Sequence, residues 1–190
     1  MEIILAENHG FCYGVKRAVE MANEAAEGKG KSYTLGPIIH NPQVVGRLES
    51  KGVSPIQEVA DIDEGTMIIR SHGVGPAIYA EAEEKGLHIL DATCPHVKKA
   101  QQDAKSVIED GMTLVILGEK NHPEVKSINL WANNKGIIIE DEESAKKLQI
   151  VEKMGVVVQT TFSQFKFNSI IDILEKKSKN LKVFKTICNA

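Results

Sequence analysis

Three cysteines are the residues of this 190-residue chain with the clearest capacity for chemistry, and they are Cys12, Cys94 and Cys188. An odd number of widely separated cysteines does not indicate a disulfide framework, and zinc sites usually contain closely spaced cysteine pairs, which this sequence lacks. Cys12 and Cys94 directly precede predicted helices, whose dipoles favour the metal-binding thiolate. The three thiols are therefore predicted to hold one iron–sulfur cluster, in which an iron without a protein ligand suggests substrate chemistry. Buried structural thiols are the alternative interpretation.

Three histidines, His40, His72 and His122, share one local pattern. Each follows a predicted strand and a short loop that contains glycine, and each precedes a helix that begins with proline. Ligands of open α/β sheets bind at the carboxyl ends of the strands, so the three imidazoles are expected to face one pocket. Together with the N–H groups of helix N-termini, imidazoles can bind a diphosphate without making the protein basic overall. A loop histidine taken singly is more often a surface residue, and the repeated pattern favours the binding interpretation.

Two further positions offer polar chemistry beside these histidines. Glu124 lies two residues after His122, in the first turn of a predicted helix. A carboxylate at this position usually complements the helix dipole, whereas in a pocket it can relay a proton. The segment Gln159-Thr160-Thr161 ends a predicted strand and offers hydroxyl groups, although it also has the composition of an ordinary strand.

The elements that carry these residues alternate between short strands and amphipathic helices, which is typical of βα units. Helices are predicted at residues 15–27, 42–51, 76–85, 97–109, 123–132 and 165–177, with a short one from residue 141. Strands are predicted at residues 3–6, 31–35, 66–70, 89–92, 113–117, 136–140, 156–159 and 181–187. Because these strands are continuously apolar, mostly parallel sheets covered on both faces are expected. The pattern divides into a first α/β domain at residues 13–96 and a second at residues 97–187.

Composition limits the classes of partner. The chain is 42% hydrophobic and 26% charged, with a formal net charge of −3. This charge gives no general attraction to nucleic acid or to an anionic membrane, so an anion site must be a local feature. No apolar run is long enough to span a bilayer, and the first residues are too acidic for a signal peptide. A cytoplasmic location with reduced thiols is expected.

Six segments, taken in order, resemble the signatures of one known enzyme family. The segments are Glu7–Val15, Gly36–Asn41, Arg70–Val74, Asp91–Pro95, Gly118–Glu124 and Gln159–Thr161. They look like those of the 4-hydroxy-3-methylbut-2-enyl diphosphate reductase family, of the LytB type. The match extends over the whole chain.

The resemblance implies a trefoil-type arrangement of three α/β domains around one 4Fe–4S cluster with an open iron. The positions that match the family's cluster ligands are Cys12, Cys94 and Cys188. Those that match its substrate-binding and proton-relaying residues are His40, His72, His122, Thr160 and Glu124. The implied reaction is a two-electron reductive dehydroxylation of the allylic diphosphate to isopentenyl and dimethylallyl diphosphates, in non-mevalonate isoprenoid biosynthesis. The implied electron donor is external, of the ferredoxin or flavodoxin type, because no nicotinamide or flavin fingerprint is present.

One departure from the family pattern concerns the third domain. Family members continue beyond this length, with a Ser-x-Asn motif that contacts the diphosphate. We therefore expect residues 1–12 to form a strand of that domain, residues 188–190 to be its start, and the rest of it to be missing. A catalytically silent diphosphate-binding module is the alternative function, and a zinc-dependent hydrolase is disfavoured by the lack of closely spaced ligands.

Overall fold

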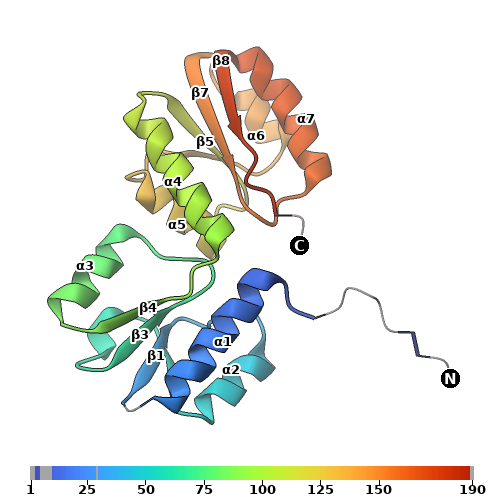
Figure 1. Cartoon of the computed structure of the whole chain (residues 1–190). Coiled ribbons are helices and arrows are strands. Elements are labelled where there is room, and N and C mark those ends of the chain that lie inside the picture. The colour runs from blue at the N-terminus through green and yellow to red at the C-terminus, as the bar shows by residue number, and fades with distance from the viewer. Residues whose placement is uncertain (1–2, 5–9, 29, 189–190) are drawn as a thin grey trace.

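The protein folds into two four-stranded parallel sheets, each flanked by helices (Figure 1). The computed structural model describes residues 3–4, 10–28 and 30–188. The strand orders are β2-β1-β3-β4 and β6-β5-β7-β8, and all pairings between strands are parallel. The predicted α/β class with parallel sheets is confirmed. Among the described residues, no helix has both the length and the apolar character needed to cross a membrane.

The first sheet and its helices form what we call the first unit, which runs from residue 13 to residue 91. Its elements are α1 (Tyr13–Glu27), β1 (Ser32–Leu35), α2 (Pro42–Glu49), β2 (Val53–Ile56), η1 (Val59–Asp61), β3 (Thr66–Ile69), α3 (Pro76–Glu84) and β4 (His88–Asp91). Helix α2 begins where expected because Pro42 occupies its first turn and the side chain of Asn41 accepts hydrogen bonds from two backbone N–H groups.

The second unit runs from residue 95 to residue 184 and repeats this pattern. Its elements are α4 (Pro95–Glu109), β5 (Thr113–Leu117), α5 (Pro123–Trp131), β6 (Ile137–Ile139), α6 (Glu142–Lys147), β7 (Val151–Val158), α7 (Gln164–Leu174), η2 (Glu175–Lys177) and β8 (Ser178–Phe184). In both units the first strand, β1 or β5, lies between the second and the third. Equivalent elements therefore follow each other in the same order, from α1 and α4 to β4 and β8.

Each sheet is buried on both faces, which explains its continuously apolar strands. In the first unit, Ile68 packs with α1 and α2 on one face, whereas its neighbours Met67 and Ile69 pack with α3 and η1 on the other. In the second unit, Ile116 packs with α4 and α5, whereas Val115 and Leu117 pack with α6 and α7. This alternation fixes the strand register, because a shift by one residue would exchange the two faces.

Three strands differ from the sequence prediction by more than two residues, and one of them is β8, which spans Ser178–Phe184 where residues 181–187 were expected. Strand β2 was not expected, because the short segment Val53–Ile56 contains Pro55. It is tolerated because β2 lies at the edge of the sheet and pairs only with β1 among the described residues. Strand β7 begins at Val151, five residues earlier than predicted, in a segment where Glu152 and Lys153 are exposed. Residues 3 and 4 of the predicted N-terminal strand have no regular structure, and its remaining residues lie outside the described part.

Candidate functional site

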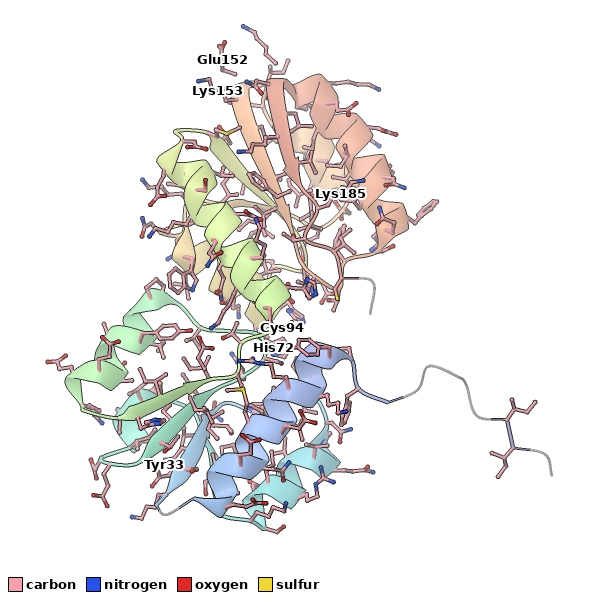
Figure 2. The ribbon with its side chains drawn as sticks, in the orientation of Figure 1. Tyr33, His72, Cys94, Glu152, Lys153 and Lys185 are labelled. Carbon is pink, nitrogen blue, oxygen red and sulfur yellow. The ribbon has the colours of Figure 1, made fainter. Side chains whose placement is uncertain are left out.

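A cavity of about 360 Å³ lies where the carboxyl ends of the two sheets meet. All eight residues predicted to act in binding or catalysis line it: Cys12, His40, His72, Cys94, His122, Glu124, Thr160 and Cys188. Figure 2 shows His72 and Cys94 together at the junction of the two units. The position agrees with the rule that ligands of parallel sheets bind at the carboxyl ends of the strands.

The three thiols are free in the sense that none forms a disulfide. Cys12 and Cys94 occupy the N-cap positions of α1 and α4, yet neither side chain caps its helix. Gly14 gives the Cys94 thiol its space, since a Cβ at residue 14 would lie 2.6 Å from Cys94 Sγ. Among the described residues these thiols form no side-chain hydrogen bond that metal binding would break, so the donor set fits an iron–sulfur cluster.

The backbone holds two of the cysteines in equivalent ways. The N–H of Cys94 donates to the carbonyl oxygen of Ser71 at 2.9 Å, and that of Cys188 donates to the carbonyl oxygen of Thr160 at 2.8 Å. Ser71 follows β3, and Thr160 follows the equivalent strand β7. Each unit therefore fixes one thiol against the strand end that also supplies polar groups to the cavity.

The three imidazoles form a compact cluster at the cavity wall. Their ring centroids are 4.6 Å apart for His40 and His72, 5.4 Å for His72 and His122, and 6.1 Å for His40 and His122. One ring nitrogen from each lies within 4.8 Å of the others, so the cluster has the dimensions to bind a metal ion as well as an anion. The Nδ1 atom of His72 is buried without a hydrogen-bond partner among the described residues. Such an atom indicates a place for a ligand.

The protonation of this cluster follows from its burial. Burial lowers the pKa of His72 to about 3, with further lowering by His40, His122 and Arg70. Burial also lowers the pKa of His122, Glu119 acts in the opposite direction, and His40 and Arg70 lower it further. His122 Nδ1 accepts a hydrogen bond from the N–H of Glu124 at 3.2 Å, which assigns the ring proton to Nε2. His72 and His122 are therefore neutral hydrogen-bonding groups near pH 7.

Glu124 is a buried carboxyl group, only 2% exposed, on the first turn of α5. The backbone N–H of Thr160 donates to its Oε1 at 2.6 Å, and the Thr160 hydroxyl donates to its Oε2 at 2.9 Å. Burial raises the pKa of Glu124, while the two hydrogen bonds from Thr160 partly oppose the rise. The carboxyl group thus retains a proton to higher pH than a free glutamic acid, which suits a proton donor.

The loop that carries His72 is held by the helices of the second unit. Trp131 Nε1 donates to the carbonyl oxygen of Val74 at 2.9 Å, and the Ser127 hydroxyl donates to the same oxygen at 3.4 Å. Gln101 Nε2 donates to the Ser127 hydroxyl at 2.6 Å. A Cβ at Gly73 would lie 2.4 Å from Gln101 Nε2, so only glycine fits this approach. The histidine position consequently depends on both units.

Sequence reasoning overlooked some residues in and around the site. His96 also lines the cavity, whereas His88 is exposed and lines a different hollow. His9, which lies near Cys12 in the sequence, is outside the described residues. Arg70 was predicted no role beyond its place in the segment Arg70–Val74, although its side chain is half-buried and acts electrostatically on His72 and His122. Comparing the two halves of the sequence would have identified it, because Arg70 and Gln159 directly follow equivalent strands.

The fold and this cavity define a parallel α/β protein with a combined thiol, imidazole and carboxyl site. The family model of the LytB protein matches residues 3–190, and the chain belongs to the LytB family. The expected resemblance is confirmed.

Three relatives illustrate the similarity. A protein of Geotalea uraniireducens named 4-hydroxy-3-methylbut-2-enyl diphosphate reductase is 47% identical over 190 residues, which cover 100% of this chain and 67% of the relative. A solved (E)-4-hydroxy-3-methyl-but-2-enyl diphosphate reductase, described as the terminal enzyme of the non-mevalonate pathway, is 43% identical to this chain with a TM-score of 0.85. The match covers 98% of this chain and 68% of the solved chain. A reductase structure from Plasmodium falciparum is 31% identical to this chain with a TM-score of 0.91, and the match covers 97% of this chain and 60% of the solved chain. The chain spans about two thirds of the length of the curated relatives it matches.

Proposed function

We propose that this chain is an iron–sulfur oxidoreductase of isoprenoid biosynthesis. Its reaction is the reductive dehydroxylation of 4-hydroxy-3-methylbut-2-enyl diphosphate to isopentenyl and dimethylallyl diphosphates. The names of the relatives support the reaction. The observation that carries the proposal is that thiols, imidazoles and a buried carboxyl group, which are distant in sequence, line one cavity.

Cys12, Cys94 and Cys188 are the proposed ligands of one 4Fe–4S cluster. Their thiols line the same cavity and do not cap their helices, as described above. When bound, such a cluster supplies electrons one at a time and an iron without a protein ligand that acts as a Lewis acid. The electrons come from an external donor of the ferredoxin or flavodoxin type, in the cytoplasm.

The histidine cluster is the proposed diphosphate site. The Nε2–H group of His122 and the unpartnered Nδ1 of His72 can each form a hydrogen bond to a phosphate oxygen. His40, which is exposed, completes the cluster from the first unit. Anchoring the diphosphate here orients the allylic end towards the thiols, and such positioning is a large part of catalysis.

Glu124 is the proposed proton donor. The reaction breaks one C–O bond, consumes two electrons and two protons, and releases one water molecule. A carboxyl group with a raised pKa can deliver a proton to the departing oxygen. The Thr160 hydroxyl, 2.9 Å from Glu124 Oε2, orients the carboxyl group and can relay the second proton.

The domain division is part of the same proposal. Residues 13–96 and 97–187 form two of three domains in a trefoil-type arrangement, and residues 1–12 and 188–190 belong to the third. The internal repeat supports the first two, since each unit has its own sheet and its own core.

The test is anaerobic reconstitution of the chain with iron and sulfide, followed by assay with the allylic diphosphate and a chemical reductant. The expected results are a brown protein with about four irons per chain and formation of both products. Iron-free protein with stoichiometric zinc would contradict the cluster. Colourless protein that binds pyrophosphate tightly without turnover would instead establish the catalytically silent binding module.

A further inference from the structure

Arg70 carries a positive charge close to the histidine cluster, two residues before His72 in the chain. It directly follows β3, and its guanidinium lies against Gly36, where a Cβ would be 2.7 Å from Nη1. Among the described residues it forms no ion pair, and its buried Nε has no hydrogen-bond partner. An arginine remains cationic under ordinary conditions, and its buried Nε–H group has lost water without gaining a partner among the described residues, which costs free energy. This unpartnered donor and its charge point to a ligand that compensates for the unfavourable free energy.

The second unit shows that this position does not require a charge. Gln159 follows β7 as Arg70 follows β3, and it packs on Gly118, whose added Cβ would lie 2.8 Å from Gln159 Oε1. Both polar atoms of the Gln159 side chain are hydrogen-bonded: Oε1 accepts from the N–H of Glu119, and Nε2 donates to the Thr161 hydroxyl, both at 2.9 Å. A neutral amide thus satisfies the same fold position. The guanidinium at residue 70 therefore has a purpose other than folding.

The charge of Arg70 acts electrostatically on the imidazoles of His72 and His122. It opposes protonation of His72 and of His122, in addition to the larger effect of burial. Arg70 also lines a second cavity of about 300 Å³ together with Pro123, the residue after His122, and Lys126. The acidic group that acts on the cluster in the opposite direction is Glu119. The fixed positive charges of this second cavity are thus on Arg70 and Lys126, while the lowered pKa values of His72 and His122 keep these two imidazoles neutral near pH 7.

Geometry alone does not decide what the three histidines bind. Three ring nitrogens within 4.8 Å of one another suit a divalent metal ion as well as a phosphate group. A guanidinium near His72 and His122 repels a dication and attracts a polyanion. We propose that Arg70 is the specificity-determining residue of this cluster, selecting a diphosphate over a divalent cation. This inference rests on the proposed function, since it concerns the diphosphate site of that reaction.

The test uses Arg70→Gln, which places in the first unit the residue that the second unit has at the equivalent position. The reconstituted chain and the variant are titrated calorimetrically, with inorganic pyrophosphate and separately with Ni²⁺. The variant is expected to bind pyrophosphate at least about tenfold more weakly and Ni²⁺ at least about tenfold more tightly, which corresponds to 1.4 kcal/mol for each. A purely structural role would weaken both, so opposite changes are diagnostic. Arg70→Lys retains the charge and should keep pyrophosphate affinity within about threefold.

Matched controls separate the two proposals. Arg47→Gln removes an exposed arginine of α2 and should change neither affinity. If the unaltered chain fails to bind pyrophosphate, the diphosphate site itself is wrong, and the role of Arg70 with it. If the unaltered chain binds pyrophosphate and Arg70→Gln binds it equally well, or binds both ligands more weakly, only the role of Arg70 is wrong.

Discussion

The first and second units follow the same path through space but contribute different chemistry to the cavity between them. After β1 and β3 the first unit supplies His40, Ser71 and His72, while Arg70 lines the neighbouring second cavity. After β5 and β7 the second unit supplies His122 and Thr160, together with Glu124 from the first turn of α5. Each unit also positions a cysteine through the carbonyl oxygen that follows its third strand. One backbone pattern thus positions two walls of the cavity, one with two of the three proposed diphosphate-binding histidines and one with the third histidine and the proposed proton donor.

The comparison separates residues that the fold needs from residues that the site needs. Glu124 and Gln43 occupy the same place in α5 and α2, directly after the helix-starting prolines. Gln43 is exposed, whereas Glu124 is buried against Thr160. Burying a carboxyl group costs free energy, so its presence in only one unit indicates selection for chemistry.

The largest expected effect is the loss of the cluster. Cys94 and Cys188 are equivalent in the two units, so Cys94→Ser and Cys188→Ser should each reduce iron from about four to below about one per chain after reconstitution. Iron and sulfide analysis with the visible absorption spectrum measures this. Ser71→Ala is the matched control, because it retains the carbonyl oxygen that accepts from Cys94. A variant of either cysteine that keeps its full iron content would remove that residue from the ligand set.

The next effect concerns turnover. Glu124→Gln should lower the rate at least about 100-fold, because the amide cannot donate an acidic proton. The cluster spectrum should stay unchanged, and the fold should persist because an amide can still pair with the N–H and hydroxyl of Thr160. Gln43→Ala, at the equivalent and exposed position, should leave the rate within about twofold. Equal rates for Glu124→Gln and the unaltered chain would exclude the proton-donor role.

Much of this site could be predicted from residue types at strand ends. The prolines at Pro42 and Pro123 and the apolar strands before His40 and His122 locate these positions without a structure. The burial of Arg70 and of Glu124 could not be predicted, because it depends on packing between units that are distant in sequence. Strand β2 was missed for a related reason: its pairing with β1 outweighs the low strand propensity of Pro55.

The two walls should also respond oppositely to pH. The lowered pKa of His72, about 3 against 6.5 when unfolded, contributes stability above pH 6.5 that is lost as the pH falls. The raised pKa of Glu124 contributes stability at low pH, and this is lost as the pH rises through that pKa.

Urea denaturation at a series of pH values measures both responses. His72→Asn should flatten the acid side, by on the order of 2 kcal/mol between about pH 6.5 and pH 4. Glu124→Gln should remove the loss of stability that sets in as the pH rises above about 4.5. His88→Asn, which alters an exposed histidine of β4, should change neither side. If the loss of stability below pH 6.5 persists in His72→Asn, it arises from the titration of other groups.

The smallest effect separates capping from binding. Asn41 caps α2 through its side chain, whereas His122 caps α5 with Nδ1 at 3.2 Å from the N–H of Glu124. His122→Asn gives α5 the asparagine N-cap that α2 has in the first unit. The free energy of unfolding should therefore change by less than about 0.5 kcal/mol, because asparagine is a good N-cap. Pyrophosphate affinity should nevertheless fall at least about tenfold, since the Nε2–H donor is lost.

Asn41→Ala provides the reverse case. It should cost about 1 kcal/mol in the free energy of unfolding, because two backbone N–H groups lose their acceptor. Pyrophosphate affinity should stay within about threefold, provided that His40 keeps its place beside His72. If His122→Asn instead lowers stability and leaves pyrophosphate binding intact, the imidazole at residue 122 serves the helix and not the ligand.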